Sequence, residues 1–155
     1  MKQKNSKAGI STGTGDIEKR RKKMEGVATF GLIIVAVAMF APFASFGGAT
    51  DWLSIGKWVY AAGALIFTFA RIAGVNDPRE SLRVRRLRRL EFWAGMAFCI
   101  GAFFWFYNEN KFGGNPWIGP LAIVRDTVLF SLVGASIQVI ASWMIAYRLK
   151  KESAK

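Results

Sequence analysis

The densest group of side chains able to bind another molecule is a block of arginines in the middle of the chain. Its six members are Arg79, Arg83, Arg85, Arg86, Arg88 and Arg89. A guanidinium group pairs bidentately with carboxylate or phosphate, so the block could hold anionic lipid head groups or an acidic protein partner. Single-stranded nucleic-acid sites interleave aromatic residues with basic ones. Residues 79–89 contain no aromatic residue, which argues against nucleic acid.

A second group is uncharged and lies in the last apolar stretch. Ser131, Gln138 and Ser142 share one face at helical spacing, together with Gly134 and Ala135. An amide inside a membrane needs a partner, and one interpretation is adhesion between helices through a hydrogen bond worth about 1 kcal/mol. The other is a substrate or ion path. No apolar stretch carries a charge at its centre, which disfavours ion-coupled transport.

Two carboxylates stand at the start of apolar stretches. Glu25 follows Lys22 and Lys23, and Glu91 follows Arg88 and Arg89. We expect both to form salt bridges within a ring of cations at a membrane interface, and a proton-handling role is the alternative.

Several kinds of chemistry lack their usual residues. The chain has one cysteine and no histidine, so intramolecular disulfides, common transition-metal sites and histidine-dependent nucleophiles are not available. We expect no metal, no cofactor and no catalytic activity. Cys99 lies among apolar residues and is interpreted as core filler.

Four apolar stretches must position these groups. They cover residues 27–46, 53–73, 91–107 and 127–147, and about 20 residues of helix reach the ~30 Å of a bilayer core. Lys57 and Arg71, near the ends of the second stretch, are expected to snorkel to the interfaces. The predicted fold is an all-α integral membrane protein with one four-helix domain over 26–151. A disordered basic tail is expected over 1–25, and a short tail over 152–155.

The positive charges predict the orientation. Eight of the 22 Lys and Arg residues lie in 1–25, seven in 71–89 and four after Tyr147, leaving Lys57, Lys111 and Arg125 elsewhere. Cationic loops stay in the cytoplasm. We therefore expect both termini and residues 74–90 to be cytoplasmic, and residues 47–51 and 108–120 to lie outside a cell (inner) membrane.

A helix is predicted to start just before the arginine block. Asp77 can cap it, Pro78 suits its first position and Glu80 its third. No helix breaker follows before the third apolar stretch, so the basic segment should continue into it as one helix. Val84, Leu87 and Leu90 form an apolar seam on this extension.

The two halves of the chain resemble each other. At an offset of 66, residues 22–48 align with 88–114 without a gap, pairing Glu25 with Glu91 and one Phe-Gly-Gly triplet with the other. Both halves start on the same side, so the pattern predicts two tandem helical hairpins related as a parallel repeat. Coincidence between two helices of similar composition is the alternative.

These observations predict a non-catalytic membrane protein, a scaffold or accessory subunit whose basic face meets anionic lipid or a membrane or cytoplasmic protein. The alternative is a small transporter or channel subunit, which would be a homo-oligomer because four short helices enclose little lumen. A lipid-modifying enzyme is disfavoured by the missing histidine and the few acids.

Overall fold

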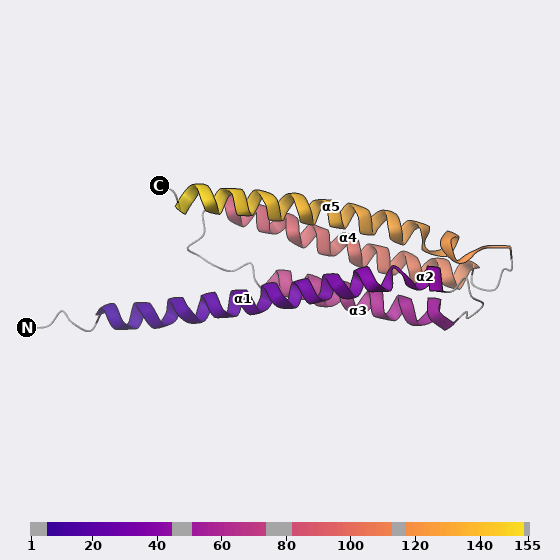
Figure 1. The fold of residues 1–155 in the computed structure, drawn as a ribbon, viewed down its shortest axis with the longest axis horizontal. Helices are drawn as coiled ribbons and strands as arrows, with labels where there is room; N and C mark the ends of the chain where they lie inside the picture. Colours follow the sequence, from indigo (N-terminus) through magenta and orange to yellow (C-terminus); the bar gives the residue numbers. More distant parts are fainter. Residues whose placement is uncertain (1–5, 45–50, 74–81, 113–116, 154–155) are drawn as a thin grey trace, which may run out of the picture.

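A computed structural model describes residues 6–44, 51–73, 82–112 and 117–153 (Figure 1). Within these ranges the chain contains no β-strand and five helices: α1 Ser6–Ala38, α2 Ala41–Ala44, α3 Asp51–Ala73, α4 Leu82–Phe112 and α5 Pro120–Ser153.

Four segments are long and apolar enough, by length and composition, to cross a membrane. They are Glu18–Phe43, Trp52–Ala73, Arg86–Phe112 and Pro120–Arg148. The prediction of an all-helical chain with four such helices is confirmed.

The long helices form two antiparallel pairs. α1 packs along α3 and α4 packs along α5, and the α3–α4 contact joins the two pairs. Both ends of the chain lie at the same end of the bundle, and the first part of α1 projects beyond it (Figure 1). We call this the terminal end, and the end that holds α2 the far end.

Small residues allow the helices to approach closely. A Cβ added at Gly31 of α1 would lie 2.8 Å from the Phe67 backbone nitrogen and 3.0 Å from the Gly63 carbonyl oxygen. One at Gly95 would lie 2.6 Å from Thr68 Oγ1, and one at Gly134 3.0 Å from the Ala94 carbonyl oxygen. Each of the three helix interfaces therefore has a position where only glycine fits without displacing its neighbour.

Aromatic side chains fill the α3–α4 interface. Tyr60, Phe67, Phe98 and Trp105 are among the largest fully buried residues. Phe67 and Phe98 meet edge to face at 5.5 Å between ring centroids, and Tyr60 lies 5.7 Å from Trp105.

The first part of α1 differs from the prediction of a disordered tail, because residues 6–25 are helical. Two ion pairs at i,i+4 spacing support this segment, Arg21 with Glu25 and Lys22 with Glu18, both at 3.2 Å. Such pairs each stabilise a helix slightly.

The first apolar stretch is interrupted. α1 ends at Ala38 rather than continuing to Phe46, and α2 begins at Ala41. Pro42 has no amide hydrogen to donate to the carbonyl of Ala38, the residue at which α1 ends, and its ring crowds that carbonyl. The Phe40 nitrogen instead bonds to the Val37 carbonyl at 3.0 Å.

The second half follows the predicted course with longer helices. α4 is one helix from the basic segment through the apolar stretch, as predicted, but it ends at Phe112 rather than Tyr107. α5 begins at Pro120 rather than Thr127, since proline suits the first helical position. The predicted start at Asp77, Pro78 and Glu80 lies outside the described residues.

Candidate functional site

A buried ion pair joins α3 to α4 at the terminal end of the bundle. Arg71 Nη1 donates to Glu91 Oε2 at 3.1 Å, and both side chains are largely shielded from solvent. The Arg71 guanidinium also lies over the Phe67 ring, 5.3 Å from its centroid. Arg71, predicted to snorkel to an interface, pairs with Glu91 because α4 offers a carboxylate at the same depth.

Glu91 extends this contact to α5. The Ser142 hydroxyl donates to Glu91 Oε1 at 3.4 Å, and Gln138 Nε2 donates to Ser142 Oγ at 3.0 Å. Three of the predicted site residues thus form one network on two helices. Gln138 does not make the predicted interhelical bond itself, because its Nε2 donates within α5 and reaches α4 only through the serine. Its buried Oε1 has no hydrogen-bond partner among the described residues.

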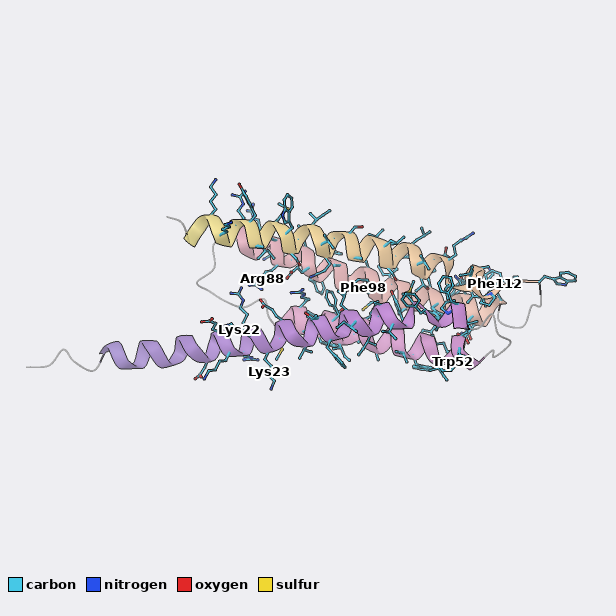
Figure 2. All side chains as sticks on the ribbon, in the orientation of Figure 1. Lys22, Lys23, Trp52, Arg88, Phe98 and Phe112 are labelled. Atoms are coloured by element: carbon cyan, nitrogen blue, oxygen red, sulfur yellow. The ribbon has the colours of Figure 1, made fainter. Side chains whose placement is uncertain are left out.

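A crevice beside the ion pair is lined by charged residues of three helices. α1 contributes Arg21, Met24 and Glu25, α3 contributes Ala70 and Arg71, and α4 contributes Arg88 and Glu91. Its enclosed volume is about 10 Å³, close to the space that one water needs. Arg88 on α4 and Lys22 and Lys23 on α1 all lie at this end of the bundle (Figure 2). We call the site formed by the seven residues that line this crevice the arginine crevice.

The arginine block does not act as one surface. Arg86 and Arg89 are exposed, whereas Arg88 is buried. Only the backbone of Arg83 and Arg85 is described, and Arg79 lies outside the described residues. The predicted apolar seam is also incomplete, because Leu87 is buried and Leu90 exposed. The side of α4 that faces the other helices carries Leu87, Arg88 and Glu91 instead.

Glu25 and Glu91 differ although they occupy matching positions in the two halves. Glu25 is half exposed and pairs within α1 with Arg21, as predicted for a carboxylate in a cationic ring. Glu91 is buried and pairs across helices. The arginine crevice brings the two together.

Ser131 belongs to a different cluster from Gln138 and Ser142. Its hydroxyl lies 2.6 Å from the Tyr60 hydroxyl of α3 and donates to the Thr127 carbonyl at 2.7 Å. Gly134 separates the two clusters because it packs against the Phe98 ring. Ala135, predicted to share the buried face, is exposed.

A second ion pair joins α3 to α4 at the far end. Lys57 Nζ donates to Glu109 Oε1 at 2.9 Å, and both side chains are mostly buried. Asn108 Nδ2 donates to the Ile123 carbonyl at 3.0 Å and to Asp126 Oδ2 at 3.1 Å, and Arg125 pairs with Asp126 at 3.4 Å.

Sequence reasoning missed both α3–α4 pairs, although a signal for them was present. Lys57 and Arg71 lie about 21 Å apart along α3, and Glu91 and Glu109 about 27 Å apart along α4. Consecutive antiparallel helices therefore carry opposite charges near both ends of their apolar stretches. Matching charges by depth would have suggested the pairing.

No group of three or more His, Cys, Asp or Glu side chains able to hold a metal ion occurs among the described residues. Comparisons of the chain with protein-family models, with curated proteins and with solved structures found no match.

Proposed function

We propose that the chain is an integral membrane protein whose four long helices span a cell (inner) membrane with both termini in the cytoplasm. In this proposal it acts without catalysis, as a scaffold or accessory subunit that presents a basic face to anionic lipid or to a protein partner. The observation that supports it best is the distribution of side chains between the outside and the inside of the bundle.

Large apolar side chains cover the outside of every long helix. They include Phe30, Ile33, Val37, Ile55, Trp58, Phe69, Trp93, Phe103, Leu132, Val139, Ile140 and Trp143. Inside the bundle, small and polar residues such as Gly31, Gly134, Thr127 and Ser131 accompany the buried aromatic residues of the α3–α4 interface. A water-soluble bundle buries its large apolar residues, and continuous apolar patches of this extent are typical of surfaces covered by lipid or protein.

The terminal end is basic. Exposed cations there come from α1, α4 and α5: Lys22, Lys23, Arg86, Arg89, Lys150 and Lys151. Each cation near an anionic membrane surface contributes on the order of 1 kcal/mol. The positive-inside rule then orients this end toward the cytoplasm.

The parallel repeat also remains a proposal. Four matching pairs are buried in both halves: Ala28 with Ala94, Gly31 with Ala97, Val35 with Gly101, and Pro42 with Asn108. The pairing of α1 with α3 and of α4 with α5 agrees with two tandem hairpins.

The proposed orientation predicts which positions react with an impermeant maleimide in intact cells. In a Cys99→Ala background, Asn110→Cys should be labelled from outside and Ser81→Cys only after the membrane is permeabilised. Asn110 is exposed at the far end, so its thiol would be accessible. The reverse pattern of labelling would overturn the orientation.

The proposed lipid contact predicts a Coulombic preference of the whole chain. After reconstitution in nanodiscs of mixed lipid, anionic lipid should be enriched around the protein, and added salt should reduce the enrichment. The double variant Arg86→Gln with Arg89→Gln should lower the enrichment of anionic lipid. The corresponding variant with lysine at both positions should retain most of it. Equal enrichment of neutral and anionic lipid would contradict the lipid role. Ion conductance or solute uptake after reconstitution in closed vesicles would favour a transporter or channel.

A further inference from the structure

We infer that the arginine crevice binds the phosphodiester of one anionic glycerophospholipid. The inference rests on the proposed membrane placement and goes further, because it assigns one lipid to one site made by three helices. It concerns Arg21, Arg71 and Arg88, whereas the general basic face consists of exposed cations outside the crevice.

The charges that line the crevice leave an excess of one positive charge. Three guanidinium groups, those of Arg21, Arg71 and Arg88, stand against two carboxylates, those of Glu25 and Glu91. A phosphodiester carries a single negative charge, and its oxygens are acceptors that guanidinium groups bind.

One donor in the crevice lacks an acceptor. The Arg71 Nε atom is buried, and among the described residues no atom accepts a hydrogen bond from it. Its Nη1 is occupied by Glu91, so the Nε–H remains for another group. Leaving a buried charged donor unsatisfied costs more than the net loss of an ordinary hydrogen bond. The parallel N–H groups of a guanidinium match the spacing of two phosphate oxygens. The donors that line the crevice therefore suit a phosphate group.

The depth of the crevice favours a lipid as the source of that phosphate. Glu91 immediately precedes the apolar part of α4, and Arg71 is in the last turn of α3. The Lys57–Glu109 pair at the far end is about 21 to 27 Å away along these helices. A hydrocarbon core is about 30 Å thick. The two ion pairs therefore lie just inside the two edges of the core. Arg88, almost one turn outside Glu91 on α4, is about 31 Å from Glu109 and thus reaches the edge that faces the lipid head groups.

The α1 side of the crevice provides access. Arg21 and Glu25 are partly exposed, whereas Arg88 and Glu91 on the opposite wall are buried. A head group would enter past α1 with its acyl chains along the apolar surface of that helix, which includes Phe30 and Ile33. The closed volume is only about 10 Å³, so one water is the competing occupant, and lipid binding requires the Arg21 side chain to move outward.

Native mass spectrometry of the full-length protein, delipidated in mild detergent, tests the inference. Phosphatidylglycerol and phosphatidylcholine with identical acyl chains are titrated separately, and inorganic phosphate is added as a competitor. Arg88→Gln should weaken phosphatidylglycerol binding about tenfold or more, the loss expected for a charged donor. Arg89→Gln is the matched control, since Arg89 is adjacent but exposed, and it should leave the tightest site unchanged.

Two further variants keep the test decisive. Arg21→Gln alters a partly exposed wall residue and should weaken binding even if Arg88→Gln fails to fold, which far-UV circular dichroism would reveal. Glu25→Gln removes a negative charge from the crevice and should strengthen binding, an effect that a purely structural role would not produce.

The outcomes separate the alternatives. Equal losses for Arg88→Gln and Arg89→Gln would reduce the contact to general surface charge and overturn the site. Displacement of lipid by millimolar inorganic phosphate would identify a free anion as the ligand and overturn the lipid assignment. Absence of any preference for phosphatidylglycerol would leave water as the occupant. A chain that washes off membranes in carbonate would instead refute the proposed function itself.

Discussion

Replacing Glu91 with leucine should destabilise the bundle by about 3 to 5 kcal/mol, the loss typical of removing one partner of a buried ion pair. The substitution leaves the Arg71 guanidinium in its buried position without its carboxylate and removes the acceptor of Ser142. Unfolding of the reconstituted protein in mixed micelles with increasing dodecyl sulfate, followed by circular dichroism, measures the change.

A second substitution identifies the cause. Adding Arg71→Met to Glu91→Leu should recover more than half of the lost stability, because a matched apolar pair often replaces a buried ion pair without loss. Glu18→Leu is the control, since the Glu18–Lys22 pair is exposed and should contribute less than about 1 kcal/mol. If the double variant is no more stable than Glu91→Leu alone, the cost does not come from the stranded arginine.

Substitution of Gly31 by alanine should lower the stability by about 1 to 3 kcal/mol, the usual cost of overpacking. The added methyl group would meet the backbone of α3 at Phe67 and Gly63. Backbone atoms cannot rotate away as a flexible side chain can, so α1 and α3 must separate along their length. The same unfolding experiment measures the effect.

Gly26 provides a matched control on the same helix. A Cβ at Gly26 would meet nothing within 4 Å, and alanine is a better helix former than glycine by up to about 1 kcal/mol. Gly26→Ala should therefore be neutral or stabilising. Equal stability of the Gly26→Ala and Gly31→Ala proteins would show that the α1–α3 contact is looser than described.

The elements that the sequence predicts well depend on short-range information. The four apolar helices follow from runs of residues that need no knowledge of their neighbours. The continuity of α4 through its basic segment follows from the absence of a breaker. The break before Pro42 could have been predicted from the proline alone, but the length of the uncharged run concealed it.

The contents of the site depend on which helices become neighbours. Arg71 appeared interfacial because its partner Glu91 is on another helix. The polar face of α5 appeared continuous because its periodicity does not reveal Phe98, which α4 inserts between Ser131 and Gln138. Arg88 and Arg89 are adjacent in the sequence, and only the rotation of α4 against α1 and α3 makes one buried and the other exposed.

The charges on α3 and α4 also bear on the order in which the chain assembles. Both cations, Lys57 and Arg71, are on α3, and both carboxylates, Glu91 and Glu109, are on α4. In the proposed membrane arrangement the first hairpin leaves the ribosome before its complementary charges have been synthesised. Its cations can face head groups until α4 arrives. A slip of α4 by one turn, about 5.4 Å, would then separate both pairs at once. Both ion pairs can therefore form in only one register of the second hairpin against the first. Because the chain is synthesised in sequence order, the hairpin that carries the two cations is made before the helix that carries the two carboxylates.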